Sequence, residues 1–410
     1  MKILVLNCGS SSVKYQLFNL DAGQETVLAS GIVEEVGLGN PRLTHKRPHQ
    51  ETIERGDLAI KNHEDAIQLV LDMLVDPGAG VLERVDEIEA VGHRVVHGGE
   101  EFAASVRIDE EVMHALYANA ELAPLHNPPN IQGIEAVTAL LPDAPQVGVF
   151  DTSFHQTMEP PAYLYALPYR FYEEYSLRRY GFHGTSHKYV ARRAAAHLGR
   201  PLESVKIVTC HLGNGASVTA VRHGRSIMTS MGFTPLEGLP MGTRCGDIDP
   251  AIVPYLMEKE DLDVEGINYL LNKESGVLGL SELSSDMRVF EEAIHAGPEH
   301  EHYERSMLVL QLYTQRIKGY IGAYAALMGG LDCVVFTGGV GENFPEVVEW
   351  SCQGLEFLGI EGVVARRAGG QIVQATPASA RTAVLVVPTN EELAIARDTY
   401  EIVTGQEIWK

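Results

Sequence analysis

Three turns rich in Gly, Asn and Ser each follow a short apolar run, and their composition suits the binding of phosphate. They span residues 7–12 (NCGSSS), 211–217 (HLGNGAS) and 337–343 (TGGVGEN), and Lys14 lies just beyond the first. Such turns direct backbone N–H groups and hydroxyls into one small volume, and a lysine adds positive charge, as a phosphate or a phosphate-bound metal requires. For any one turn alone, an ordinary surface hairpin remains the alternative.

Charged side chains occur where other apolar runs stop. Asp151 and Glu391 each follow an apolar run, and Arg94 lies near the end of a third. Arg244 lies in a long Gly/Pro-rich loop, residues 232–250, and such a loop within a compact domain is usually functional. Phosphoryl transfer depends on positioning and charge neutralisation, so it needs metal ligands, backbone cradles and arginines more than a strong nucleophile. Singly, these arginines could form surface ion pairs and the acids could cap helices, but together they predict phosphoryl transfer.

Familiar nucleotide-binding signatures are absent from the sequence. Residues 9–14 lack the second glycine and the Lys-Ser/Thr ending of a P-loop, and residues 339–344 lack the third glycine of a dinucleotide fingerprint. The motif set of protein kinases is also missing. What remains is a set of Gly/Asn/Ser turns at the ends of predicted strands.

The elements that must position these residues alternate between strands and helices. The apolar patterns predict strands over residues 88–96, 146–150, 331–336 and 384–388, and helices over residues 64–75, 131–141, 183–198 and 301–328. We expect residues 123–130 to form a loop, residues 337–343 a turn, and further helices to begin at about residues 345 and 391. This alternation, with polar residues at strand ends, favours an α/β fold with its site at those ends. The apolar stripe of the 301–328 helix is predicted to be core.

The opening hairpin has an echo at residues 206–221. Both copies begin with Lys-Ile, continue as an apolar strand, pass through a Gly/Asn/Ser turn and return as a second strand. The sequence therefore predicts two related halves that face each other with phosphate loops at their junction, and a change of domain near residue 152.

Composition limits the class of protein. A chain of 410 residues suggests two domains, and a formal charge of -23 disfavours nucleic acid and anionic membranes as partners, because both require positive surface. The five cysteines are scattered without a CxxC pair, which indicates neither a disulfide framework nor a zinc site. The sequence starts directly in a predicted strand and has no apolar stretch of about 20 residues, so we expect a cytoplasmic protein.

Nine motifs in chain order resemble the acetate kinase family, and the resemblance runs from end to end. They are residues 7–12 (NCGSSS), 92–99 (GHRVVHGG), 150–155 (FDTSFH), 181–187 (GFHGTSH), 211–216 (HLGNGA), 241–249 (MGTRCGDID), 285–288 (SDMR), 337–343 (TGGVGEN) and 388–392 (PTNEE). The resemblance implies the duplicated two-domain α/β fold of actin, sugar kinases and heat-shock chaperones, with ATP in the interdomain cleft. It also implies a homodimer and the reaction of ATP with acetate to give ADP and acetyl phosphate.

The resemblance further implies domain and residue roles. Residues 1–151, completed by 389–410, would form the acetate-side domain, and residues 152–388 the nucleotide-binding domain. Asp151, His183 and Arg244 would be catalytic, and Mg²⁺ or Mn²⁺ would be held by Asn7 and Glu391. The acceptor would be held by Arg94, Val96, Leu125, Phe182 and Pro235. The nucleotide would contact Lys14, His211, Leu212, Gly213, Asn214, Gly215, Asp286, Met287, Arg288, Gly339, Val340, Gly341, Glu342 and Asn343.

Two features of the residues bear on mechanism and specificity. A carboxylate acceptor is already ionised at neutral pH, so we expect Asp151 to orient an arginine or a metal-bound water and not to abstract a proton. Val96 lies two residues beyond Arg94, so on a continuous strand both side chains share a face, and the acceptor's methyl group would meet Val96. We therefore expect acetate to be preferred over propionate. Propionate kinase, and an ATP-driven conformational module like actin, remain as alternatives.

Overall fold

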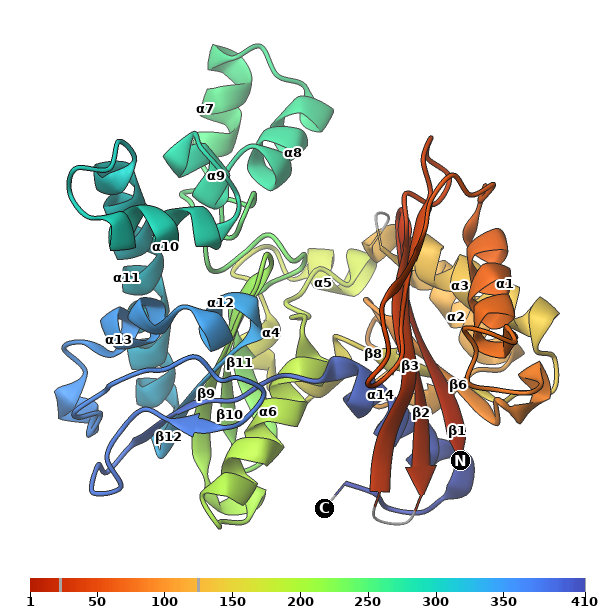
Figure 1. The fold of residues 1–410 in the computed structure, drawn as a ribbon. Coiled ribbons are helices and arrows are strands. Elements are labelled where there is room, and N and C mark those ends of the chain that lie inside the picture. Colours follow the sequence, from red (N-terminus) through yellow and green to blue (C-terminus); the bar gives the residue numbers. More distant parts are fainter. Residues whose placement is uncertain (22–23, 124–125, 410) are drawn as a thin grey trace. The chain divides into compact units, whose positions relative to one another are not determined.

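The computed structural model describes residues 1–21, 24–123 and 126–409 and divides into two compact units. The first unit comprises Met1–Phe154 and Asn390–Lys410, and the second comprises His155–Thr389. Figure 1 shows the chain coloured from red to blue, with the blue C-terminal helix α14 (Glu391–Thr404) packed in the first unit among the red and orange strands. No helix within the described ranges has the length and apolar character needed to cross a membrane.

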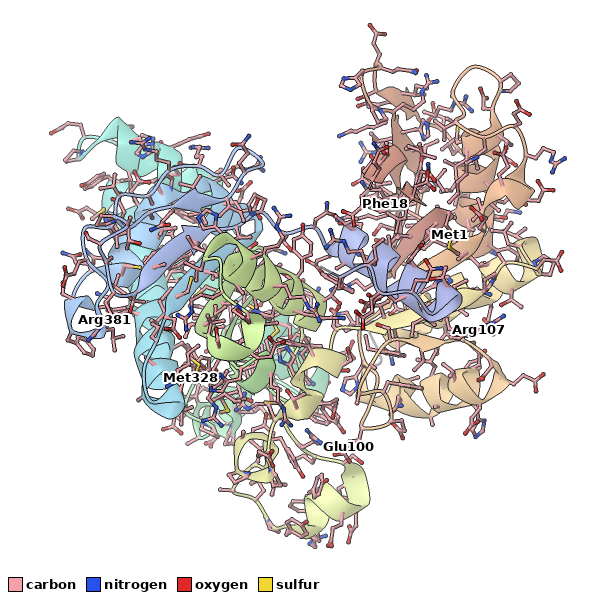
Figure 2. All side chains as sticks on the ribbon, turned by 90° about the horizontal axis from the view of Figure 1, so that it is seen from below. Met1, Phe18, Glu100, Arg107, Met328 and Arg381 are labelled. Carbon is pink, nitrogen blue, oxygen red and sulfur yellow. The ribbon has the colours of Figure 1, made fainter. Side chains whose placement is uncertain are left out.

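The first unit is built on an eight-stranded sheet in the order β5-β4-β3-β2-β1-β6-β8-β7. Strands β1, β6 and β8 are mutually parallel, and their neighbours are antiparallel. The strands are β1 (Lys2–Gly9), β2 (Ser12–Asp21), β3 (Gln24–Glu34), β4 (Arg42–Lys46), β5 (Ile53–Arg55), β6 (Ala90–Val95), β7 (Val106–Arg107) and β8 (Gln146–Phe150). Met1 and Phe18, labelled in Figure 2, mark where the start of β1 lies beside the end of β2. The other helices of this unit are α1 (His63–Val75), α2 (Glu110–Ala118) and α3 (Asn127–Leu140).

The alternation of side chains along β1 shows which helices cover each face of this sheet. Leu4 and Leu6 pack in the core that includes residues of α1 and α3, whereas Ile3 and Val5 pack in the core that includes Ile395 of α14. Successive side chains of a strand point to opposite faces, so even-numbered residues of β1 face α1 and α3 and odd-numbered residues face α14. This parity places Asn7 on the α14 face.

The second unit repeats the central part of this topology. Its six-stranded sheet has the order β11-β10-β9-β12-β14-β13, in which β9, β12 and β14 are parallel and β9-β10-β11 form an antiparallel meander. The order β3-β2-β1-β6-β8 of the first sheet matches β11-β10-β9-β12-β14 of the second, which confirms the predicted duplication. The strands are β9 (Lys206–Leu212), β10 (Ala216–Arg222), β11 (Arg225–Thr229), β12 (Cys333–Thr337), β13 (Val373–Gln374) and β14 (Ala383–Val386).

The helices of the second unit include the longest of the described chain, α11 (Tyr303–Met328), with 26 residues. It packs on β9 and β10, and its buried residues include Leu310, Tyr313, Ile317 and Ile321, so the predicted stripe is core. The others are α4 (Pro160–Tyr163), α5 (Arg170–Tyr175), α6 (Gly184–His197), α7 (Ile252–Lys259), α8 (Val264–Lys273), α9 (Gly276–Ser281), α10 (Met287–Ala296), α12 (Gly338–Asn343) and α13 (Pro345–Cys352). Met328, labelled in Figure 2, marks the end of α11.

Three local predictions were wrong. Residues 127–130 were expected in a loop but form the first turn of α3, where proline is tolerated because the first N–H groups of a helix have no intrahelical partner. Residues 338–343 were expected in a turn but form α12. Val96 was expected to continue the strand of Arg94, but β6 ends at Val95 and Val96 lies in a bend.

Candidate active site

Five predicted site residues of the first unit share one face and one end of its sheet. Asn7 pairs with Lys14 across β1 and β2, and both lie near the turn between these strands. Ala90 of β6 and Val149 of β8 pack in the core beside α14, so by alternation Arg94 and Asp151 lie on this same face. Glu391 is the first residue of α14 itself. We call Asn7, Lys14, Arg94, Asp151 and Glu391 the strand-end cluster.

Gly92 shows how closely α14 approaches this face. A Cβ atom at Gly92 would lie 2.4 Å from Oγ1 of Thr399 and 2.8 Å from Cγ2 of Ile395, so β6 and α14 can pack at this distance only with glycine there. The close packing holds the middle of α14 against β6, and Glu391 lies about one turn before Ile395 on the same helix.

Arg94 and Asp151 form a two-pronged ion pair at the centre of the cluster. Nη2 of Arg94 donates to Oδ2 of Asp151 at 2.6 Å, and Nε donates to Oδ1 at 3.2 Å. The Asp151 side chain is 1% exposed and that of Arg94 is 23% exposed. The attraction of Asp151 raises the pKa of Arg94 further, against the opposing effect of burial. Because the carboxylate holds two of the three guanidinium nitrogens, the direction of the arginine is set by Asp151.

The side chains of Glu391 and Asn7 provide oxygen atoms that could bind a metal ion and that accept no hydrogen bond from a described residue. The N-cap of α14 is made by Asn390, whose Oδ1 accepts from the N–H of Leu393 at 3.0 Å, so the Glu391 carboxylate is not engaged in capping. Burial raises the pKa of Glu391 to about 7, although nearby Arg94 acts in the opposite sense. Carboxylate and amide oxygens are the ligands that Mg²⁺ prefers, so the donor chemistry of this pair fits that ion.

The predicted acceptor residues are divided between the two units. Val96 is buried, and its N–H donates to Oδ1 of Asn130 at 3.0 Å, which fixes the bend after β6. Leu125 lies outside the described residues. In the second unit Phe182 is buried and Pro235 is half-buried.

In the second unit, histidines surround the turn between β9 and β10. His183 is the N-cap of α6 and has a left-handed backbone, with φ of 57°, which is uncommon for a residue other than glycine. Its Nδ1 hydrogen-bonds to Oγ of Ser217 at 2.9 Å, and its ring lies 4.3 Å from that of His211. Nδ1 of His211 hydrogen-bonds to Oγ of Ser186 at 2.8 Å, so both rings are held by hydroxyls.

Arg244 lies beside the same turn, without a carboxylate partner among the residues that the structure describes. A Cβ atom on Gly215 would lie 3.4 Å from Nε2 of His183 and 3.6 Å from Nη1 of Arg244, so both side chains border the turn. Nη1 of Arg244 donates to the carbonyl oxygen of Pro235 at 3.3 Å, and within the described ranges no carboxylate forms an ion pair with it. Burial lowers the pKa of Arg244. A half-buried guanidinium without a counter-ion is suited to binding an anion.

The loop that carries Arg244 has no helix or strand but is internally fixed. The N–H of Gly238 donates to Oδ1 of Asp247 at 2.9 Å, and the N–H of Met241 donates to the carbonyl oxygen of Arg244 at 3.0 Å. The N–H of Gly242 donates to the carbonyl oxygen of Asn214 at 3.1 Å, which ties the loop to the turn after β9.

A pocket of about 590 Å³ adjoins this turn. Eight predicted nucleotide residues line it: Gly213, Asn214, Asp286, Met287, Arg288, Gly339, Val340 and Asn343. The lining also includes four residues that were not predicted: Ser285, Glu291, Phe344 and Arg367. Ser285 and Phe344 directly adjoin predicted residues, whereas Arg367 lies in an irregular segment whose sequence carried no signal.

Several other predicted nucleotide residues lie outside the lining of this pocket. Leu212 and Gly341 are buried, His211 has the hydroxyl partner described above, and Gly215 borders His183 and Arg244. Oε1 of Glu342 accepts from the N–H groups of Gly338 at 3.0 Å and Thr389 at 3.1 Å, so this carboxylate joins α12 to the end of β14. Lys14 belongs to the first unit.

Comparisons with known proteins show which family this chain belongs to. The Acetokinase family profile matches residues 2–397. An acetate kinase of Alkaliphilus metalliredigens is 55% identical over 98% of this chain and 100% of that protein, and one of Pseudothermotoga lettingae is 57% identical over 98% of each. The crystal structure of Porphyromonas gingivalis acetate kinase has a TM-score of 0.92 and 47% identity, covering 98% of this chain and 100% of that one. A propionate kinase of Francisella tularensis has a TM-score of 0.86 and 37% identity, covering 98% and 99%. This chain belongs to the acetokinase family.

Proposed function

We propose that this protein catalyses reversible phosphoryl transfer between ATP and acetate, giving ADP and acetyl phosphate. The observation that carries this proposal is the sequence identity of 55 to 57% between this chain and proteins named acetate kinase, over nearly its whole length. The propionate kinase that it resembles is 37% identical, so propionate is the less favoured acceptor. The arrangement of side chains within each unit agrees with this reaction.

The main obstacle to the reaction is repulsion between two anions, the carboxylate and the terminal phosphate. Arg94, oriented by Asp151, would bind the acceptor carboxylate, and Arg244 with His183 would stabilise the transferred phosphoryl group. Acetate is already ionised at neutral pH, so no general base is required, and Asp151 serves best as the partner of Arg94. Neutralising charge at preorganised donors is the principal means of catalysing phosphoryl transfer.

Asn7 and Glu391 would hold the Mg²⁺ ion. When bound, the ion would neutralise phosphate charge. Lys14, opposite Asn7 in the hairpin, adds a cation to the same sheet end and would contact the phosphates.

In the second unit, the turn at Gly213–Gly215 with His211 would cradle the phosphates, and the 590 Å³ pocket would take the nucleoside. Its lining by Met287, Val340 and Phe344 offers apolar contact to a base, while Asp286 and Asn343 offer polar groups for the sugar or base.

We also propose that the protein is a homodimer through an exposed face of α11. Leu308, Leu312, Gly319 and Ala323 recur at helical spacing along a groove on that helix, and Leu308 and Leu327 are 45% and 56% exposed. A second copy would cover these side chains together with Gln311, Gln315 and Arg316, which line the same groove. Leu308→Glu should convert the dimer to a monomer in size-exclusion chromatography with light scattering, and a monomeric parent would refute the proposal.

The test of function is ATP consumption with and without acetate, in Mg²⁺ and hydroxylamine, which traps acyl phosphate. The proposal predicts acetate-dependent hydroxamate formation equal to the ADP produced. ADP formation that is independent of acetate would favour the conformational ATPase instead. Parallel assays with propionate would identify a propionate kinase if propionate gave the higher kcat/KM.

A further inference from the structure

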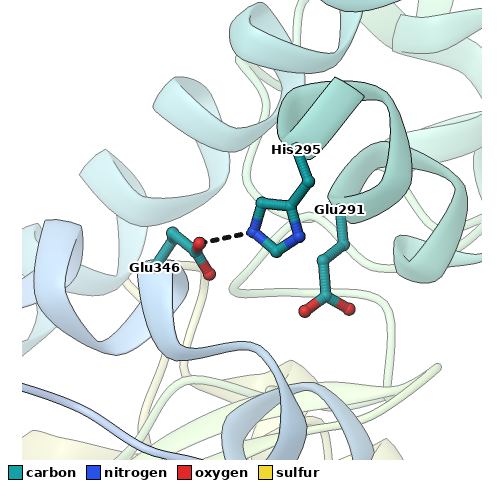
Figure 3. Close-up of side chains that lie close together, drawn as sticks. All are labelled: Glu291, His295 and Glu346. Atoms are coloured by element: carbon teal, nitrogen blue, oxygen red, sulfur yellow. Dashed lines mark hydrogen bonds and ion pairs between the residues drawn. The ribbon is translucent and has the colours of Figure 1, made fainter. Parts of the chain in front are cut away.

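Three potential metal ligands gather beside α10 and α13, away from the strand-end cluster. Glu291 and His295 lie one turn apart on α10, and Glu346 lies in the first turn of α13. One ligand atom from each lies within 4.8 Å of the other two. Figure 3 shows the Glu346 carboxylate and the His295 ring directed at each other, with the Glu291 carboxylate turned towards the same space. The two helices both pack on α11, which holds them in place.

Of these three side chains, Glu346 has one carboxylate oxygen without a hydrogen-bond partner among the described residues. Nε2 of His295 hydrogen-bonds to Oε1 of Glu346 at 2.6 Å, and Oε1 of Glu291 accepts from Nη2 of Arg367 at 2.5 Å. Oε2 of Glu346 is buried and has no hydrogen-bond partner among the described residues. Buried carboxylate oxygens are rarely left without a partner, because desolvation is costly. The Glu346 side chain as a whole is 27% exposed, so the buried part is its Oε2 end, and a cation bound at the cluster would give that oxygen a partner.

We propose that Glu291, His295 and Glu346 form a binding site for a divalent transition metal, with Zn²⁺ as the expected ion. Zn²⁺ accepts both imidazole nitrogen and carboxylate oxygen, whereas Mg²⁺ and Ca²⁺ prefer oxygen ligands only, so the imidazole favours Zn²⁺. Glu346 has no cationic side chain of Lys or Arg paired with it among the described residues, whereas the charge of Glu291 is already shared with Arg367, so a bound dication would compete with Arg367 for Glu291. Three protein ligands leave a coordination position for water, and His295, with a side chain 53% exposed, provides access from solvent.

This site adjoins the predicted nucleotide pocket. Glu291 is 8% exposed, lines the 590 Å³ pocket and holds Arg367, which also lines it. A metal ion that binds Glu291 would therefore change the charge of the pocket lining formed by Glu291 and Arg367. The metal-binding proposal does not depend on the proposed reaction and is tested without nucleotide.

The alternative is a structural ion pair, in which His295 and Glu346 simply join α10 to α13. The chain offers a matched control for this alternative. Glu110 and His114 on α2 have the same four-residue spacing as Glu291 and His295, but no third ligand completes a cluster there in the described chain. His114 is exposed, so substituting it should leave the fold intact.

The experiment is equilibrium dialysis of the full-length protein, freed of metal with EDTA, against Zn²⁺, with Co²⁺ absorption as a second probe. We expect one tight equivalent of Zn²⁺ in the parent and in His114→Gln. Loss of even an outer partner of a metal site costs about 10- to 100-fold in affinity, so His295→Gln and Glu346→Gln should each weaken binding at least that much. Circular dichroism of both variants verifies that they are folded.

Equal Zn²⁺ affinity in the parent, His295→Gln and Glu346→Gln would overturn the proposal, because binding would then occur elsewhere. Absence of a tight equivalent in the parent would overturn it as well, and the cluster would be a structural ion pair only. Co²⁺ spectra that lose the signature of nitrogen and oxygen ligation in His295→Gln but keep it in His114→Gln would support it. Kinase activity in Mg²⁺ is measured separately, so a failure of the proposed reaction is distinguishable from a failure of this site.

Discussion

The pairing of Arg94 with Asp151 predicts that these two residues act as one unit in the reaction. The double-mutant cycle uses Arg94→Gln, Asp151→Asn and the combined variant, which remove charge while retaining polar side chains. If Asp151 acts by orienting Arg94, removing either one abolishes the same interaction with the acceptor. The combined variant should then lose little more activity than the worse of the two single variants.

The magnitude follows from the burial of the pair. Breaking a buried ion pair leaves an uncompensated charge and costs about 3 to 5 kcal/mol. Arg94 is 23% exposed, so water partly compensates it and the lower end applies. If this energy appears in the transition state, about 3 kcal/mol corresponds to a loss of roughly 100-fold in kcat/KM for each single variant. Asp151→Asn should also lower the free energy of unfolding, because its carboxylate is almost fully buried.

The assay is hydroxamate formation from acetate and ATP, with kcat/KM measured for all four proteins, and urea unfolding provides the stability of each. Losses that simply add in the combined variant, about 10,000-fold in total, would refute the shared role. They would indicate that Asp151 has its own function, such as proton transfer.

Further predictions concern other residues. Arg244→Ala should reduce kcat/KM by orders of magnitude in the hydroxamate assay while the unfolding midpoint is retained, because no carboxylate depends on it. Val96→Ala should raise kcat/KM for propionate relative to acetate, within the roughly 10- to 200-fold that one methylene provides, and an unchanged ratio would contradict a methyl pocket there. Gly92→Ala should cost about 1 to 3 kcal/mol in urea unfolding, since its Cβ meets α14, whereas Gly322→Ala, with open space, should not destabilise. Burial lowers the pKa of His93 from 6.5 to about 4. Between these pH values the unfolded state binds a proton that the folded state does not, so the free energy of unfolding should fall as the pH decreases from about 6.5 to about 4. In urea unfolding at a series of pH values, His93→Asn should reduce this dependence.

The sequence could predict elements whose pattern is local. The strand Gln146–Phe150 has the predicted bounds, and the long helix differs from prediction by two residues at its start, because apolar periodicity alone defines both. Helix α12 could not be predicted, since glycines disfavour helices. Its first residue, Gly338, has φ of 79° and lies against the backbone of Leu212, where a Cβ would come within 2.7 Å of the carbonyl oxygen, so glycine is required there. Glu342 then holds its first turn through the N–H of Gly338.

For the site, too, the sequence could predict only features that depend on local pattern. Polar residues at strand ends are visible in sequence, and the parity of β1 and β6 is enough to place Asn7 and Arg94 on one face. That Asp151 occupies two nitrogens of Arg94 depends on the register between β6 and β8, where Arg94 is opposite Val149. Arg367 could not be assigned, because its place in the pocket comes from an irregular segment that only tertiary contacts position.

The duplication itself indicates how one sheet core supports two kinds of chemistry. Counting from the shared Lys-Ile start, Asn7 of β1 corresponds to His211 of β9, and their cross-strand partners are Lys14 and Ser217. The first unit therefore carries an amide and a cation at the hairpin position where the second carries an imidazole and a hydroxyl. On the neighbouring parallel strands, β6 and β12, the register with β1 and β9 makes Arg94 the counterpart of Thr337. At these matched positions the charged side chains lie in the first unit, where the proposed acceptor and metal would be held. In the second unit backbone N–H groups, hydroxyls and histidines surround the turn beside Arg244, where phosphates would be cradled under the same proposal.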